Sequence, residues 1–129
     1  MTTADFTISI DRSRRLIDVA MRGFYGPADV LRYRKAIDAA TTELGGEPAQ
    51  QVMINDITGM QIQLQDIVTA FRGFMADPRY VGRRVAFIVT TSLARMHVER
   101  VMQGRTARTF VCREEAESWL FGEGARAAA

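Results

Sequence analysis

The C-terminal end of this chain constrains its fold more than any other segment. A short β-type run, Arg108–Val111, passes without a linker into a helix expected over about 113–121. That helix begins with an acidic first turn and carries an apolar stripe of Ala116, Trp119 and Leu120. A strand that leads directly into a terminal helix needs a sheet built by earlier segments. The sequence therefore predicts a domain of repeating β and α units.

The first 24 residues predict an antiparallel hairpin at the margin of that sheet. Apolar and polar residues alternate over 6–10 and again over 15–24, and turn-forming residues 11–14 separate the two runs. Alternation with period 2 is typical of strands that bury one face and leave the other in water. The hairpin is therefore expected to be only partly covered.

Three amphipathic helices are expected before the C-terminal one. Apolar residues recur at spacings of three and four over Pro27–Leu44, over about 63–76 and over about 93–103. Gly45-Gly46 can end the first helix, and Thr91 or Ser92 can cap the third. In the third helix His97 falls on the apolar arc, whereas Met96 falls on the charged side.

Two further strands are expected between these helices. Val52–Ile54 is short and leads into polar, turn-forming residues 55–59. The uninterrupted run Val85–Val89 is typical of a strand covered on both faces, and it is expected at the centre of the sheet. The order predicts an α/β fold: one mixed sheet of about five strands, an N-terminal antiparallel hairpin followed by parallel β-α units, with about four helices. The domain is expected over 1–121, and 122–129 as a frayed tail.

Composition limits the classes of function. A chain of 129 residues fits one domain, and no apolar run approaches the roughly 20 residues of a membrane span. The N-terminus lacks the pattern of a secretory signal, so a cytoplasmic location is expected. The single Cys112 excludes an intrachain disulfide and a cysteine zinc cluster. No phosphate-binding loop, dinucleotide motif or metal-spaced cluster occurs, so no cofactor is expected.

Basic residues are unevenly distributed although the net charge is only +2. Residues 79–113 hold eight arginines and one acid, Glu99. Most of these arginines are expected to be solvated, and the alternative is contact with an anion or a headgroup. Nucleic-acid binding is not expected, because the excess is local and is not interleaved with exposed aromatic residues.

Several motifs together resemble the SpoIIAA-like proteins of the wider STAS/SEC14-type domain group. The resemblance covers about 6–120. It rests on the order and spacing of Arg22–Tyr25, the helix Pro27–Leu44, Val52–Asp56, Arg84–Val89, Ser92–Arg95, and Phe110 followed by Glu115–Leu120. It implies a mixed sheet with packed helices that works as a non-catalytic interaction or small-ligand module, with lipid or other apolar ligands for some relatives.

The resemblance also implies a phosphorylation site that this sequence lacks. Phosphorylated anti-sigma-factor antagonists carry a hydroxyl residue just before the helix that follows the third strand. The matching residues 59–66 contain no serine or threonine, and Thr58 is the nearest alternative. A phosphorylation switch of that kind is therefore not expected.

Catalysis is not expected from the residues present. His97 is the only histidine, and it could meet Ser92 or Asp56 only through tertiary contact. Cys112 precedes a helix start that could activate a thiol, although a cysteine at a strand end is more often a packing residue. A receiver-like phospho-signalling domain is an alternative based on Asp56, but no acidic pair accompanies it and the only lysine, Lys35, lies on the first helix. A small hydrolase is the other alternative.

Two classes of function remain. In one, the half-polar hairpin and Met96 form a homotypic or partner surface. In the other, a pocket between the second and third helices holds a small apolar or amphipathic ligand, with arginines of 79–113 at its mouth for an anionic headgroup or carboxylate. The candidate contacts for ligand or partner are Asp56, Thr58, Leu64, Phe71, Met75, Ser92, Arg95, Met96, His97 and Arg100.

Overall fold

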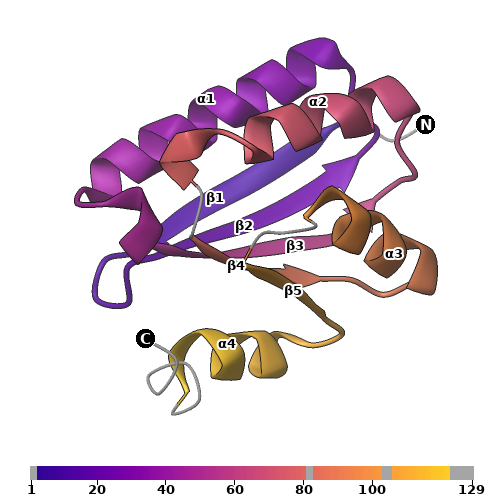
Figure 1. Ribbon diagram of the computed structural model, residues 1–129. Helices are drawn as coiled ribbons and strands as arrows, with labels where there is room; N and C mark the ends of the chain where they lie inside the picture. Colours follow the sequence, from indigo (N-terminus) through magenta and orange to yellow (C-terminus); the bar gives the residue numbers. More distant parts are fainter. Residues whose placement is uncertain (1–2, 81–82, 103–105, 123–129) are drawn as a thin grey trace.

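A five-stranded mixed sheet forms the centre of the molecule (Figure 1), in a computed structural model that describes residues 3–80, 83–102 and 106–122. The strands lie in the order β1-β2-β3-β4-β5; β1 and β2 pair antiparallel and every later pair is parallel. The sheet therefore confirms the predicted hairpin followed by parallel units. The strands are β1 (Asp5–Asp11), β2 (Leu16–Gly23), β3 (Val52–Met60), β4 (Arg84–Ile88) and β5 (Ala107–Phe110).

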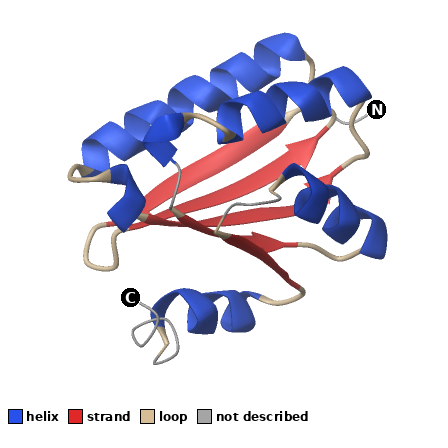
Figure 2. Cartoon of the chain, viewed as in Figure 1, coloured by secondary structure: helices blue, strands red, loops and turns tan. Residues whose placement is uncertain are grey.

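Three helices cover one face of the sheet, and the fourth covers part of the other (Figure 2). The order confirms the sequence prediction, and the helix ends differ from it by two residues at most. Two short 3-10 turns, η1 (Pro48–Gln50) and η2 (Pro78–Tyr80), precede β3 and β4. The helices are α1 (Pro27–Leu44), α2 (Gln65–Met75), α3 (Ser92–Val101) and α4 (Arg113–Phe121). Of the predicted tail, only Gly122 lies within the described residues.

The third strand corrects two expectations. Residues 55–59 were expected to form a turn, but they continue β3 to Met60, with a register shift opposite Ala20/Arg22. Asn55 and Asp56 fit in a strand because Asn55 bonds to Tyr33 and Asp56 accepts hydrogen bonds from Thr58. The central strand is β3, and not the run that becomes β4.

The sequence of β4 is apolar without interruption, although β4 is not the central strand of the sheet. The strand lies next to the edge strand β5, yet helices cover both of its faces. Val85 and Phe87 pack on the side of α1 to α3, while Ala86 and Ile88 pack against Ala116 and Leu120 of α4. Burial on both faces was therefore a correct inference, although the position in the sheet was not.

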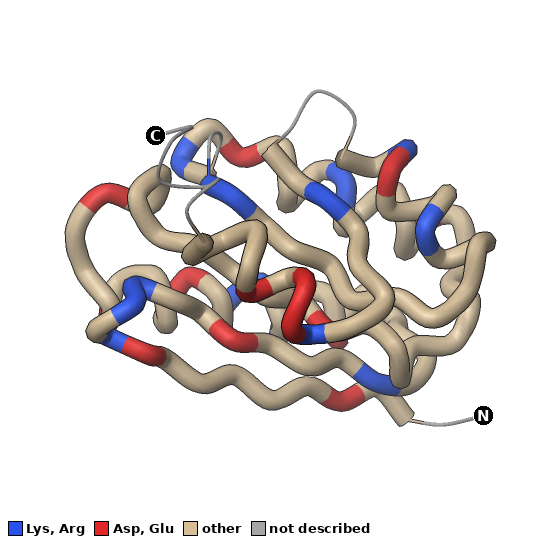
Figure 3. Tube along the Cα trace, turned by 90° about the horizontal axis from the view of Figure 1, so that it is seen from below, with Lys and Arg blue, Asp and Glu red and all other residues tan. Residues whose placement is uncertain are grey.

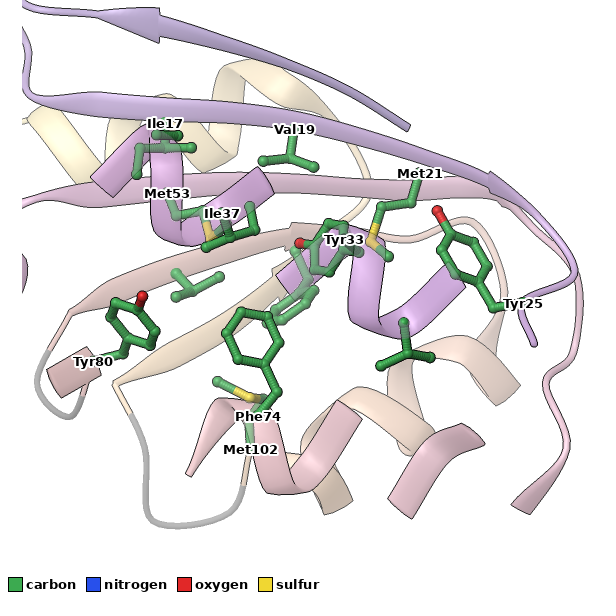
Figure 4. Packing of buried hydrophobic residues seen from close by; sticks show 14 of the residues in the cluster. Ile17, Val19, Met21, Tyr25, Tyr33, Ile37, Met53, Phe74, Tyr80 and Met102 are labelled. Atoms are coloured by element: carbon green, nitrogen blue, oxygen red, sulfur yellow. The ribbon is translucent and has the colours of Figure 1, made fainter. Parts of the chain in front are cut away.

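The larger core lies between the sheet and α1 to α3. Figure 4 shows Ile17, Val19 and Met53 of the sheet on the side that faces α1, and Phe74 of α2 near Tyr33. The Tyr33 ring meets the Phe74 ring edge to face, with centroids 6.0 Å apart. Aromatic pairs of this geometry stabilise a core beyond their apolar area. This core positions α2 and leaves α3 as the outer helix of the layer.

The arrangement of strands excludes the receiver-like alternative. A receiver domain is a doubly wound sheet of parallel strands in which the chain order reverses. Here the strands follow the chain order and the first pair is antiparallel. Lys35 is exposed on α1, which is not where an ion pair with a phosphorylated strand end would need it.

Candidate functional site

A cavity of about 650 Å³ opens between α2, α3 and the carboxyl ends of β3 and β4. Its walls are largely apolar: Phe71 and Met75 come from α2, Leu93 and Val101 from α3, and Phe87 from β4. A volume of this size is ordinary for small-molecule sites, which span roughly 300–1,000 Å³. The space between these two helices is therefore large enough for a ligand.

The cavity exists because α3 does not pack fully onto the sheet. No residue of α3 is fully buried, although its apolar arc faces inward. The small side chain of Ala94 lies on that arc and lines the cavity. The helix is fixed at its start by Thr91, whose Oγ1 accepts a hydrogen bond from the Ala94 backbone at 3.0 Å.

Gln63 fixes the loop at the cavity mouth. Its Nε2 donates to the Gly23 carbonyl at 3.0 Å, and its Oε1 accepts from the Tyr25 backbone N–H at 2.8 Å. Gly23 has a positive φ of 86°, and a Cβ there would lie 2.3 Å from the Thr3 carbonyl oxygen, so only glycine fits. The end of β2 and the approach to α2 are held together at this point.

Two polar side chains line the cavity from α1 and β3. Asn55 is 3% exposed, and its Nδ2 donates to Tyr33 Oη at 3.2 Å. Among the described residues, Asn55 Oδ1 has no hydrogen-bond partner. Burial raises the pKa of Tyr33 above its usual range, so the hydroxyl stays neutral and can donate. The cavity therefore holds one buried polar pair among apolar walls.

The cavity brings together three of the residues expected at a site. Phe71, Met75 and His97 line it from the two helices. Leu64 is 59% exposed at the residue before α2 and is not part of the lining. Ser92, Arg95, Met96 and Arg100 are exposed on α3 outside the cavity.

Asp56 and Thr58 lie away from the cavity. Asp56 follows Asn55 in β3, so its side chain points to the opposite face of the sheet. The Asp56 Oδ1 accepts hydrogen bonds from the Thr58 backbone N–H at 2.9 Å and from Thr58 Oγ1 at 2.7 Å. The two residues bind each other within β3 and not a group in the cavity.

None of the arginines expected at the mouth is among the described residues that line the cavity. The polar groups of the lining are Tyr33, Asn55, Gln61, Gln63, Thr91 and His97, and none is an arginine. Basic and acidic positions are interspersed over the molecule (Figure 3), and Arg113 pairs with Asp18 while Arg79 pairs with Asp77. Arg105 lies outside the described residues.

Most arginines of 79–113 were expected to be solvated, but Arg83 is buried. It is only 4% exposed, and its Nη2 donates to Thr41 Oγ1 at 3.0 Å and to Gln51 Oε1 at 3.2 Å. Its guanidinium also stacks 4.4 Å from the centre of the Tyr80 ring. Burial lowers the pKa of Arg83. This arginine holds η1 and α1 to the start of β4.

Sequence reasoning missed Asn55, Tyr33 and Gln63 as cavity residues. Tyr33 belongs by its spacing to the apolar stripe of the first helix, and the pattern of residues 55–59 predicts a turn beginning at Asn55. One signal was available, since Asn55 is the only asparagine of the chain and directly follows an apolar strand. No comparable pattern marks Gln63.

The described residues do not assemble a familiar catalytic group. No hydrogen bond joins His97 to Ser92 or Asp56 within the described part of the chain, and Cys112 lies half-buried before α4. No group of three or more histidine, cysteine or acidic side chains among the described residues could hold a metal ion.

Solved structures share this fold, although no family model and no curated protein matches the sequence. An uncharacterised protein of the DUF3478 family from Shewanella loihica PV-4, described as having a SpoIIAA-like fold, matches with a TM-score of 0.72 and 16% identity. The match covers 93% of this chain and 97% of that one. This chain has the SpoIIAA-like fold. An anti-sigma factor antagonist from Mycobacterium paratuberculosis matches with a TM-score of 0.61 and 9% identity, over 92% and 94% of the two chains.

In this SpoIIAA-like fold the segment that lacks a phosphorylation motif joins β3 to α2. Residues 59–66 include the end of β3, the cavity loop with Gln63 and the first turn of α2. The absence of a phosphorylation switch at this segment stays a prediction. None of the described helices has the length and apolar character needed to cross a bilayer.

Proposed function

We propose that this domain is a non-enzymatic binding module that holds a small, largely apolar molecule in the cavity between α2 and α3. The observation that carries the proposal is the cavity itself, about 650 Å³ in volume and walled by side chains such as Phe71, Met75 and Leu93. Its apolar walls favour ligands that leave water, because each buried methylene contributes about 0.8 kcal/mol. A ligand in the cavity that shifts the loosely packed α3 would give the domain a regulatory role.

Chemical reasoning supports binding over turnover. A hydrolytic site needs a nucleophile with a base and donors for the developing charge. His97 is the one histidine at the cavity, and no cysteine, serine or carboxylate joins it among the described lining residues. The non-enzymatic assignment therefore rests on the composition of the cavity wall.

Native mass spectrometry of freshly purified protein gives the first test. We expect a co-purifying small molecule, or saturable uptake of the apolar fluorescent probe N-phenyl-1-naphthylamine by the empty protein. Ala94→Phe, which fills the cavity, should abolish probe uptake, while Ala70→Phe on the exposed side of α2 should retain it. Thermal unfolding of both variants controls for loss of fold. Absence of any bound molecule and equal probe uptake by both variants would refute the proposal.

Protein contact is a second candidate, favoured by large apolar side chains that are exposed beside the same cavity. Ile62 and Leu93 line the cavity and are exposed, and Leu64 and Met96 are exposed on the same two segments. Light scattering during size-exclusion chromatography tests self-association through them. We expect a dimer that Met96→Glu dissociates; a strict monomer at high concentration counts against self-association. A contact through the hairpin stays a prediction, with Thr7 and Ser9 exposed along β1.

A further inference from the structure

We propose that the ligand carries, at one end of an apolar body, an uncharged group that both donates and accepts a hydrogen bond, and that Asn55 and Tyr33 bind this group. Primary amides, alcohols and protonated carboxylic acids have this chemistry. The inference rests on the proposed function, because it names the polar end of the molecule that the cavity would hold.

The polar pair is buried and incompletely bonded. Asn55 is 3% exposed and Tyr33 is 2% exposed, and both line the cavity. One hydrogen bond of 3.2 Å joins Asn55 Nδ2 to Tyr33 Oη, and Asn55 Oδ1 has no partner among the described residues. Buried polar groups are nearly always paired, and an unpaired acceptor is costly. A ligand donor at Oδ1 would remove that cost.

The pair offers one acceptor and one donor whichever way the carboxamide is turned. With Nδ2 donating to Tyr33, Asn55 Oδ1 is a free acceptor and the Tyr33 hydroxyl hydrogen is a free donor. With the amide turned over, Tyr33 donates to Oδ1, Nδ2 becomes the free donor and Tyr33 Oη the free acceptor. Both arrangements complement a group that donates and accepts side by side.

Charge excludes an ionised carboxylate as the preferred group. A carboxylate only accepts hydrogen bonds, so with Nδ2 donating to Tyr33 it would leave Asn55 Oδ1 unbonded. It would also bring a charge among apolar walls, where an unpaired charge is costly. The titratable groups of the described lining are Tyr33, which burial keeps neutral, and the half-exposed His97 on α3. No arginine or lysine of the described lining offers a counter-charge.

Three probes with one chain length separate these requirements: octanamide, N,N-dimethyloctanamide and octanoate at pH 8. Their dissociation constants are measured by displacement of N-phenyl-1-naphthylamine. Octanamide donates and accepts, the dimethyl compound only accepts, and octanoate is charged. We expect octanamide to bind about ten- to a hundredfold more tightly than either, because with Nδ2 donating to Tyr33 the other two compounds leave the buried Asn55 Oδ1 unbonded. The two extra methyl groups of the dimethyl compound favour its burial, so this preference cannot arise from the hydrophobic effect.

Substitutions test whether Asn55 and Tyr33 cause the preference for octanamide. Asn55→Leu removes both polar atoms at similar volume, and it should make octanamide and its dimethyl derivative bind about equally. Tyr33→Phe should weaken the preference as well. Tyr25→Phe is the matched control: it also loses a buried hydroxyl, which donates to the Asp5 carbonyl at 2.7 Å, but it lies outside the lining and should keep the preference.

The outcomes distinguish this inference from the function on which it rests. Probe binding with equal affinity for the two amides in the wild-type protein overturns the inference and leaves the apolar cavity intact. A preference that persists in both Asn55→Leu and Tyr33→Phe overturns it too, since another group would then bind the amide. Failure to bind any of the three compounds or the fluorescent probe overturns the proposed function and this inference together.

Discussion

Replacing Leu120 by alanine tests how α4 is docked on the sheet. Leu120 is 1% exposed and belongs to the core that α4 forms with β2, β3 and β4, including Leu16, Ile54 and Ala86. Within the described residues α4 is the one helix on this face (Figure 1), so no other helix can fill the space left by the side chain.

The size of the effect follows from the three carbon atoms that Leu120→Ala removes. Their transfer from water contributes about 2.4 kcal/mol at roughly 0.8 kcal/mol per methylene, and the remaining cavity raises the total to about 3–5 kcal/mol. In a domain of this size, that loss lowers the midpoint of thermal unfolding by roughly 10–20 °C. Since small domains have free energies of unfolding of roughly 5–15 kcal/mol, this loss is a large share of the total.

Urea unfolding of Leu120→Ala and Leu31→Ala provides the comparison. Leu31 is also a helical leucine, but it is 53% exposed on α1, so its replacement should change the free energy of unfolding by only about 0.5 kcal/mol. Similar values for the two variants, or a loss below about 1 kcal/mol for Leu120→Ala, would refute the docking of α4 described here. Probe uptake measured well below the transition should persist, because the cavity lies on the other face.

Two further substitutions test polar contacts. Arg83→Ala should cost about 3 kcal/mol in urea unfolding, because it removes charged hydrogen bonds to Thr41 and Gln51 and leaves a buried amide oxygen without a donor; a change below about 1 kcal/mol would contradict this role. Asp11→Asn should flatten the acid dependence of stability, since the hydrogen bond from Arg14 above all lowers the pKa of Asp11 to about 2. The ionised carboxylate stabilises the fold above its unfolded pKa of about 3.9, and this contribution is lost as the pH falls towards 2. Urea midpoints from pH 2 to 6 that fall equally in both proteins would be the contrary result.

The elements could be predicted from the sequence because each depends on local periodicity. The stripe of α1 and the alternation of β1 and β2 record which side of each element faces the core. The position of a strand in the sheet and the burial of an arginine depend instead on distant partners. Arg83 is buried because Thr41 and Gln51, 42 and 32 residues away in the chain, accept its hydrogen bonds. No local pattern contains that information.

A cavity wall and a core have the same sequence pattern. Phe71 and Phe74 lie on the same apolar stripe of α2, yet Phe74 is buried in the core while Phe71 is half-buried and lines the cavity. Periodicity shows only that both side chains avoid water. The location of a pocket between the second and third helices was therefore within reach of sequence reasoning, whereas its volume and its polar groups were not.

The unpaired acceptor of Asn55 is the observation that separates a binding cavity from a packing defect. A defect is apolar throughout, and a smaller or larger side chain could remove it at a modest cost in stability. Here an asparagine interrupts the apolar run of β3 in the cavity lining, and its buried Oδ1 has no hydrogen-bond partner among the described residues. Asn55→Leu should therefore raise the free energy of unfolding of the empty protein while removing its preference for octanamide. A gain in stability together with a loss of discrimination would identify Asn55 as a residue retained for binding; a loss of stability would show that its bond to Tyr33 serves the fold.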